Sequence, residues 1–122
     1  MKIKESAENY LETILMLSKE KNRVRSIDVA NELNFSKASV SVAMKSFREE
    51  GYITIDDDGG ILLTEKGLNI AMRVFERHDI IARVLILLGV SEKTAYADSC
   101  KMEHDISEES FEKLKEFLQK GF

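Results

Sequence analysis

The sequence predicts a mainly α-helical fold with a small β wing, in which a winged helix-turn-helix is followed by a helical dimerisation lobe. Three observations lead to this prediction. Apolar side chains recur at helical spacing over most of the chain, and a break of only two residues, Asn34 and Phe35, separates two helical segments. Two β-prone runs joined by an Asp/Gly cluster then follow the second of these segments. This order of elements is the winged helix-turn-helix layout.

Two helices are expected at the start of the chain. Ser6 is placed to cap a first helix that runs to about Lys19. Its apolar side is formed by Tyr10, Leu11, Ile14, Leu15 and Leu17. Ser26 is expected to cap a short helix over residues 27–33, with Asp28 in the first turn, where the helix dipole favours an acid.

The third helix and the hairpin complete the predicted winged helix. Ser36 caps this helix, which runs to about Glu50 and ends at Gly51. Its buried stripe follows the spacing i, i+3, i+4, i+7 and consists of Val40, Ala43, Met44 and Phe47. The runs 52–55 and 61–64 flank the Asp/Gly cluster 56–60 and predict a β-hairpin.

Three further helices are predicted after the hairpin. Thr64 caps a long helix from Glu65 to about Leu88, which Gly89 ends. The next two helices begin after serines, Ser91 and Ser107, and run to about residues 105 and 121. We expect two domains: a winged-helix DNA-binding domain over residues 1–72 and a helical metal-binding and dimerisation domain over residues 73–122.

The composition places the protein among ordinary globular chains. It has 122 residues, of which 43% are hydrophobic and 33% charged, and this balance argues against disordered and membrane classes. No apolar run reaches the roughly 18 residues that span a bilayer. The N-terminal residues lack the apolar region of a secretory signal, and the single cysteine cannot form an internal disulfide. We therefore expect a cytoplasmic protein that has no membrane partner.

The net charge of −4 is unlike that of most nucleic-acid-binding proteins, but the positive charges are clustered. The segment 36–48 contains Lys37, Lys45 and Arg48 and no acid. The segment 19–25 contains four lysines and arginines against one glutamate. Both segments are therefore able to face DNA phosphates.

The third helix begins with small polar side chains, which allow a helix end to approach a DNA groove closely. Serine hydroxyls bond phosphates or base edges, and Ala38 suits a thymine methyl group. The candidate DNA-binding residues are Arg25, Ser26, Ser36, Lys37, Ala38, Ser39, Ser41, Val42 and Lys45. The alternatives are a solvated helix face and a winged helix used only for protein contacts.

A second set of residues has metal-binding chemistry. Cys100, Glu103 and His104 lie at i, i+3 and i+4, so one helix face presents a thiolate, a carboxylate and an imidazole. Further donors must come from other helices, and His78, Asn9 and Glu12 are the candidates. Taken singly, each residue has a plainer interpretation, such as a buried cysteine, a core histidine or a solvated acid.

The chain resembles the diphtheria-toxin-repressor family of iron- and manganese-dependent regulators over essentially its whole length. The resemblance rests on residues 8–14 (ENYLETI), residues 62–67 (LLTEKG), the pair Arg77-His78 and residues 100–104 (CKMEH). In that family, metal binds between the DNA-binding and dimerisation lobes and locks the recognition helices of a dimer into positions that fit DNA. We expect a short, two-lobe form, because nothing follows Phe122 for the small β-barrel domain of longer members.

The resemblance also implies roles for individual residues. It makes Cys100, Glu103 and His104 primary-site ligands, and it matches Glu12 and His78 to ligand positions. Asn9 stands where relatives have Met or Asp and offers only a neutral amide oxygen. Ala82 and Tyr96 stand where some iron-type members have ligands of an ancillary site, so that site is expected to be absent or altered.

The thiolate favours Fe²⁺, Co²⁺, Ni²⁺ or Zn²⁺ over Mn²⁺, whereas carboxylate and amide oxygens accept Mn²⁺. Since cytoplasmic availability also counts, we expect Fe²⁺ first and Mn²⁺ next.

More apolar side chains occur in the last three helices than one short domain can bury, which predicts a twofold homodimer and a palindromic operator. The apolar side chains concerned are Ile80, Ile81, Val84, Leu85, Leu87, Leu88, Phe111, Leu114, Phe117 and Leu118. The function expected is metal-dependent repression of metal-uptake genes.

Two rival classes are weighed against this expectation. An enzyme would use Cys100 as nucleophile and His104 as base, but the sequence offers no oxyanion site or substrate pocket, so we expect no enzyme. The other rival is a winged-helix regulator that senses an organic ligand or an oxidant, with Cys100 as a redox switch.

Overall fold

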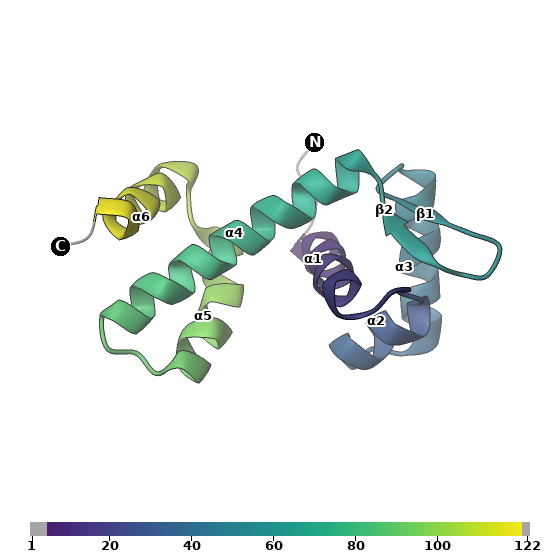
Figure 1. Cartoon of the computed structure of the whole chain (residues 1–122), viewed down its shortest axis with the longest axis horizontal. Coiled ribbons are helices and arrows are strands. Elements are labelled where there is room, and N and C mark those ends of the chain that lie inside the picture. Colours follow the sequence, from purple (N-terminus) through teal and green to yellow (C-terminus); the bar gives the residue numbers. More distant parts are fainter. Residues whose placement is uncertain (1–4, 121–122) are drawn as a thin grey trace. The chain divides into compact units, whose positions relative to one another are not determined.

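The computed structural model describes residues 5–120, and these divide into two compact units after Met72 (Figure 1). The elements, in chain order, are α1 (Glu5–Glu20), α2 (Ser26–Leu33), α3 (Lys37–Glu49), β1 (Ile53–Ile55), β2 (Ile61–Leu63), α4 (Glu65–Leu87), α5 (Glu92–Asp105) and α6 (Glu108–Lys120). The predicted fold class, mainly α with a small β wing, is confirmed. No helix among these residues combines the length and apolar content needed to cross a membrane.

The core of the first unit lies where α1, α2 and α3 pack together. Leu11 and Ile14 of α1 are almost completely buried, as are Val29 of α2 and Val40 and Met44 of α3. This burial confirms the stripe predicted on α3, except that Ala43 is only half-buried. At one end of the core, the ring of Tyr10 packs edge-on against the rings of Phe35 and Phe47.

Most helix starts follow the predicted caps. The hydroxyl oxygens of Ser36, Thr64, Ser91 and Ser107 each accept a main-chain N–H three residues later, at 3.1, 3.2, 3.4 and 3.1 Å. Such bonds satisfy amides that have no partner inside the helix.

Two predicted caps are wrong. Ser6 lies inside α1 rather than before it, because the helix already includes Glu5. Ser26 is the first residue of α2, and Arg25 is its cap residue. The reason is that the amides of Asp28 and Val29 donate to the main-chain carbonyl of Arg25, so the helix begins one residue earlier than expected. The carboxylate of Asp28 reaches back and accepts the main-chain N–H of Arg25 at 2.9 Å.

The predicted hairpin is present as an antiparallel pair in which Ile53 faces Leu63 and Ile55 faces Ile61. A third segment, which was not predicted from the sequence, extends this pair. The N–H of Ile61 donates to the carbonyl of Val24 at 2.7 Å, so the residues before α2 pair with β2. The wing is therefore attached to the helix-turn-helix at two places. The chain leads from α3 into β1, and β2 pairs with the residues before α2.

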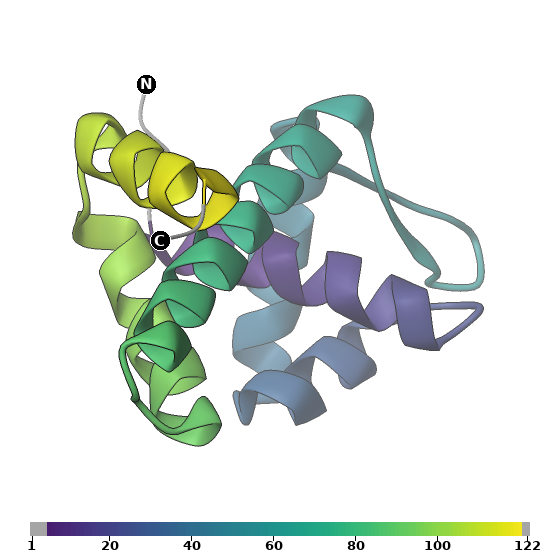
Figure 2. The same ribbon diagram turned by 60° about the vertical axis from the view of Figure 1, so that its left-hand side comes forward.

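The second unit consists of residues 73–87 of α4 together with α5 and α6, and α5 lies alongside this part of α4 (Figure 2). Ile81, Ala82, Ala95 and Phe111 are buried in it. Arg77 ties the three helices together. Its Nη2 donates to the carbonyl of Ile106 at 2.6 Å, and its guanidinium lies over the ring of Phe111 at 5.3 Å.

Candidate functional site

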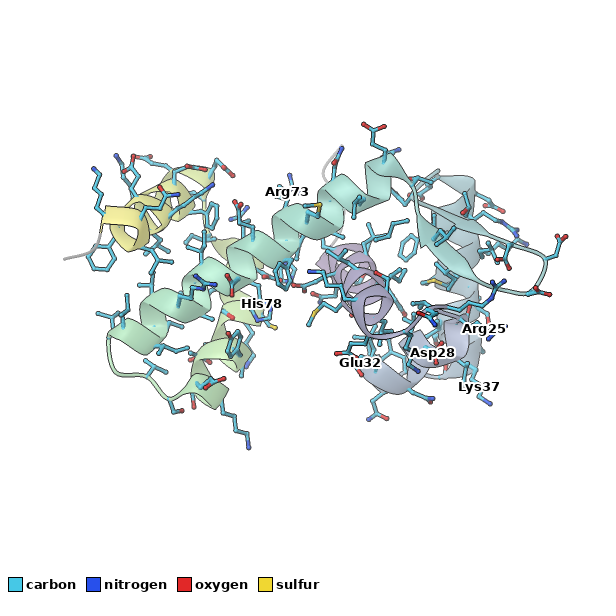
Figure 3. All side chains as sticks on the ribbon, viewed as in Figure 1. Arg25, Asp28, Glu32, Lys37, Arg73 and His78 are labelled. Carbon is cyan, nitrogen blue, oxygen red and sulfur yellow. The ribbon has the colours of Figure 1, made fainter. Side chains whose placement is uncertain are left out.

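Four side chains of types that can bind a metal form a row of neighbours within the second unit, on α4 and α5. Cys100 Sγ lies 3.3 Å from Nε2 of His78, whose side chain is labelled in Figure 3. A ring nitrogen of His78 and a carboxylate oxygen of Glu103 lie within 4.8 Å of each other. A distance of 3.4 Å then separates Glu103 Oε1 from His104 Nε2. His78 and Cys100, which lie 22 positions apart in the chain, are thereby brought together.

The ring of His78 is held in a defined orientation. Its Nε2 lies 3.2 Å from the carbonyl oxygen of Tyr96, and its ring packs edge-on against the Tyr96 ring at 5.7 Å. An imidazole that donates its Nε2 proton to this carbonyl has its lone pair on Nδ1. Metal-bound histidines are commonly oriented by a carbonyl in this way. This contact was not predicted from the sequence, since a main-chain carbonyl leaves no signal in residue type.

The separation of the two atoms then suits one metal ion. Cys100 Sγ and His78 Nδ1 are 3.8 Å apart. Bond lengths of about 2.3 Å for sulfur and about 2.1 Å for nitrogen, at a tetrahedral angle, would separate these two atoms by about 3.6 Å. The separation alone therefore allows one divalent transition metal to bind both atoms. The sulfur is nearer to Nε2, at 3.3 Å, so shared binding through Nδ1 also requires the imidazole ring to turn its Nδ1 lone pair toward the ion.

Glu103 and His104 form the inner part of the cluster. Their side chains are 1% and 4% exposed, whereas Cys100 is exposed at the surface. A buried carboxylate is costly unless charge and hydrogen bonds compensate it. A divalent cation bound at Glu103 would compensate the carboxylate charge.

The remaining two candidates, Asn9 and Glu12, belong to the first unit. They lie three residues apart on α1, and therefore on one face of the helix. Glu12 is only 6% exposed, and Asn9 is half-buried. A nearly buried carboxylate between the core residues Leu11 and Ile14 is unusual for a helix surface.

The start of α3 presents an exposed polar surface. Every candidate DNA-binding residue of this helix, from Lys37 to Lys45, is exposed, and Val42 is 71% exposed although it is apolar. Ser36 and Ser39 are partly occupied in capping the helix, because the Ser36 hydroxyl donates to Ser39 Oγ at 2.8 Å. Of the two remaining candidates, Arg25 is exposed and Ser26 is half-buried.

The two basic segments differ in how their charges are used. In segment 36–48 all three cations are exposed. In segment 19–25, Lys21 pairs with Asp28 at 2.8 Å and Arg23 pairs with Asp56. The hydrogen bond from Lys21, followed by that from the Arg25 amide, holds the pKa of Asp28 below its ordinary value. The pKa of Asp56 is also lowered, mainly by the N–H of Gly60. These pairs were not predicted from the sequence, because their partners lie up to 33 residues apart.

Comparison with known proteins covers nearly the whole chain. A family model described as the iron dependent repressor N-terminal DNA binding domain matches residues 2–61. A second model, described as the iron dependent repressor metal binding and dimerisation domain, matches residues 64–121.

Individual relatives agree with these models. The chain is 38% identical over 118 residues to a helix-turn-helix-type transcriptional regulator of Methanocaldococcus jannaschii, covering 95% of this chain and 94% of that protein. It is 32% identical to the transcriptional regulator MntR of Geobacillus kaustophilus, covering 93% of this chain and 81% of that one. The structure of the manganese regulator SloR superposes with a TM-score of 0.80 at 27% identity over 93% of this chain. The chain spans 53% of the SloR chain, about half its length.

Proposed function

Because the chain belongs to the diphtheria-toxin-repressor family of metal-dependent transcriptional regulators, we propose that a divalent transition metal switches on its repression of metal-homeostasis genes. The family resemblance found in the sequence is thereby confirmed. The chain is a DNA-binding regulator that forms homodimers, and it is not an enzyme. Family membership also favours metal over an organic ligand or an oxidant as the signal.

The observation that supports metal control most directly is the cluster on α4 and α5. We assign His78, Cys100, Glu103 and His104 as ligands, since each of these side chains lies close to the next, Cys100 to His78, His78 to Glu103 and Glu103 to His104. We assign Asn9 and Glu12 of α1 as the ligands that complete the site. Their shared helix face and the burial of Glu12 support this assignment.

The role of the protein in the switch follows from where these residues lie along the chain. The metal, when bound, supplies positive charge and coordination bonds at these side chains. Glu12 is flanked by Leu11 and Ile14, which are fixed in the core on which α2 and α3 pack. A restraint on Glu12 is therefore passed to α3, the helix that reads DNA. By thermodynamic linkage, DNA must tighten metal binding by the same factor by which metal tightens DNA binding, typically about 5- to 150-fold.

We propose that each protomer of the homodimer inserts α3 into the major groove at one half of a palindromic operator. The direct contacts are assigned to Arg25, Ser26, Ser36, Lys37, Ala38, Ser39, Ser41, Val42 and Lys45. The exposure of the α3 residues and the absence of acids from segment 36–48 support these contacts. A regulator of chromosomal genes acts in the cytoplasm, and we place this protein there.

The metal is assigned as Fe²⁺ first and Mn²⁺ second. The thiolate of Cys100 and the imidazoles of His78 and His104 favour Fe²⁺, whereas Glu12, Glu103 and the amide of Asn9 accept Mn²⁺. The relative SloR is a manganese regulator, so both metals must be compared directly in this protein.

The decisive experiment is a titration of DNA binding with Fe²⁺, Mn²⁺ and Zn²⁺ beside a chelator control. The DNA is an operator duplex enriched from a randomised library by the metal-loaded protein. We expect metal to tighten binding about 5- to 150-fold and the chelator to reverse the effect. His104→Ala should abolish the metal response, while Lys101→Ala, on an exposed neighbouring position, should retain it. Equal DNA affinity with metal and with chelator would refute metal control.

A further inference from the structure

The acidic tip of the wing holds one of the arginines that precede α2. Arg23 and Arg25 flank Val24, which pairs with Ile61 of β2 and is only 2% exposed. Alternate residues of an extended chain point to the same side. The two arginine side chains therefore lie on the side opposite to Val24, next to the loop 56–60 between β1 and β2, which Figure 1 shows as an open turn.

Arg23 makes the closest contacts with this loop. Its Nη2 donates to Oδ2 of Asp56 and lies 3.6 Å from Oδ2 of Asp58. The other carboxylate oxygen of Asp56 is fixed by the N–H groups of Asp58 and Gly60, at 2.9 and 2.8 Å. Asp56 is therefore an immobile acceptor, and the ion pair does not have to order two flexible side chains, which is the usual cost of a surface pair.

Gly60 provides the room for this pair. A Cβ atom at Gly60 would lie 2.8 Å from the guanidinium carbon of Arg23 and 2.8 Å from Oδ2 of Asp56. Since Gly60 has no positive φ, an alanine fits its backbone and would displace only side-chain atoms, the guanidinium of Arg23 and the carboxylate oxygen of Asp56 that bonds it. The pair can thus be opened without a change in charge.

The same loop contacts Arg25 through a main-chain carbonyl rather than a carboxylate. Among residues 5–120, only the Nε of Arg25 is engaged, donating to the carbonyl of Asp58 at 3.1 Å, so its terminal amino groups stay available for phosphates. A free arginine in this position would add a sequence-independent contact to the DNA backbone. The loop 56–60 therefore leaves the terminal amino groups of Arg25 available for a phosphate, whereas its acids bind the guanidinium of Arg23.

We propose that Asp56 and Asp58 limit sequence-independent DNA binding by withholding Arg23 from the DNA backbone. The ion pair lowers the affinity for DNA of arbitrary sequence, because it removes one phosphate contact. This inference rests on DNA binding by the first unit and not on the metal centre. It can therefore fail while metal control stands, and the reverse.

The test measures binding of the whole chain to a random-sequence duplex by fluorescence anisotropy, between about 50 and 200 mM salt. The double variant Asp56→Asn with Asp58→Asn should bind about three- to ten-fold more tightly at the lowest salt, with a salt slope steeper by about 0.9, because Arg23 then reaches one additional phosphate. Adding Arg23→Gln should remove this tightening, whereas Arg23→Gln in the native chain should change affinity less than about twofold.

Asp57→Asn is the control, because it removes one negative charge from the same loop, where the double variant removes two, and Asp57 contacts neither arginine in the described part of the chain. A tightening by Asp57→Asn of half that of the double variant or more, on a logarithmic scale, would mean that net charge alone acts, and would overturn the proposal. Weaker binding by the double variant, with its helical circular dichroism intact, would overturn it too, since the acids would then present Arg23 to DNA. If the double variant does not fold, Gly60→Ala decides: the same steeper salt slope is expected, and an unchanged slope rejects the proposal.

Discussion

In the second unit, the sulfur of Cys100 lies 3.3 Å from Nε2 and 3.8 Å from Nδ1 of His78. The two residues belong to different helices, α5 and α4, and Arg77 fixes these helices by its bond to the carbonyl of Ile106. The sulfur and the imidazole therefore lie side by side in the folded unit. This proximity makes Cys100 the residue on which metal selection is best tested.

Replacement of Cys100 by serine keeps the size of the side chain and removes the thiolate. We expect Co²⁺ added to the native protein to give thiolate charge-transfer absorption, and Cys100→Ser to lack it. Fe²⁺ affinity should fall by at least about tenfold, because even the loss of a residue that only orients a metal ligand lowers metal affinity by this factor. Cys100→Glu should move the preference toward Mn²⁺, because oxygen donors suit that ion.

Lys101→Ser is the control for these variants, since Lys101 is exposed on the next position of α5 and is not a proposed ligand. Absence of the absorption band from the native protein would show that Cys100 does not bind the metal. An unchanged order of metals in Cys100→Glu would show that this residue does not select among them.

How much of this site could be predicted depended on distance along the chain. The spacing of Cys100, Glu103 and His104 fixes a shared helix face, so their grouping followed from the sequence alone. His78 was chosen only for its residue type, because nothing local shows which face of α4 packs on α5. The Tyr96 carbonyl that orients His78 could not be foreseen, since its role depends on the main chain.

The same limit applies to the fold. The caps at Ser36, Thr64 and Ser91 are local hydrogen bonds, and residue type predicted them correctly. Ser26 failed as a cap because the amides of Asp28 and Val29 donate to the main-chain carbonyl of Arg25, so the helix begins one residue earlier than expected. The pairing of Val24 with Ile61 and of Arg23 with Asp56 joins residues more than 30 positions apart, which no periodicity reveals.

Asp28 should make the first unit sensitive to acid. Its carboxylate accepts from Lys21 Nζ at 2.8 Å and from the Arg25 amide at 2.9 Å, and its pKa is lowered in the folded state. The stabilisation is therefore complete above the unfolded-state pKa of about 3.9 and is lost as the pH falls through the lower, folded-state value. Asp28→Asn should lower the free energy of unfolding at pH 7 by about 0.5–2 kcal/mol, as for a lost cap.

Urea unfolding of native and Asp28→Asn proteins between pH 7 and about 2.5 provides the measurement, and the difference between them should shrink at the acid end. Asp57→Asn, in the exposed wing loop, should follow the native curve. A difference that stays constant down to the acid end would exclude the carboxylate charge as its source.

Gly67 should be intolerant of a side chain. It lies in the first turn of α4, where a Cβ atom would overlap the carbonyl oxygen of Tyr52. That carbonyl also accepts the N–H of Thr64 at 3.0 Å, so the backbone cannot move away without loss of this bond. Although alanine usually stabilises a helix relative to glycine, Gly67→Ala should lower the free energy of unfolding by about 3 kcal/mol, the upper range for overpacking.

Thermal unfolding followed by circular dichroism measures this change. Asn69→Ala, at an exposed position of the same helix, should leave the melting temperature unchanged or raise it slightly. If both alanines raise the melting temperature, the close approach of Gly67 to Tyr52 does not exist in solution.

The C-terminal end of α4 should supply part of the homodimer interface. Ile81 and Val84 are buried within the second unit, but Leu87 and Leu88 are 52% and 70% exposed, and Phe117 of α6 is 37% exposed. Apolar side chains exposed this far in a homodimer are typical of its contact surface. Leu87→Glu places a charge there and should raise the dimer dissociation constant by at least about 30-fold, the effect of losing one central anchor.

Light scattering and sedimentation over a range of protein concentrations measure the change in the dimer dissociation constant of the Leu87→Glu variant. Met72→Glu, at a similarly exposed position earlier on the same helix, should leave the dimer intact. Since a palindromic operator requires two copies of α3, the Leu87 variant should also lose operator affinity, and it should regain it as the protein concentration rises. A variant that stays dimeric at the lowest concentrations would place the interface elsewhere on the second unit.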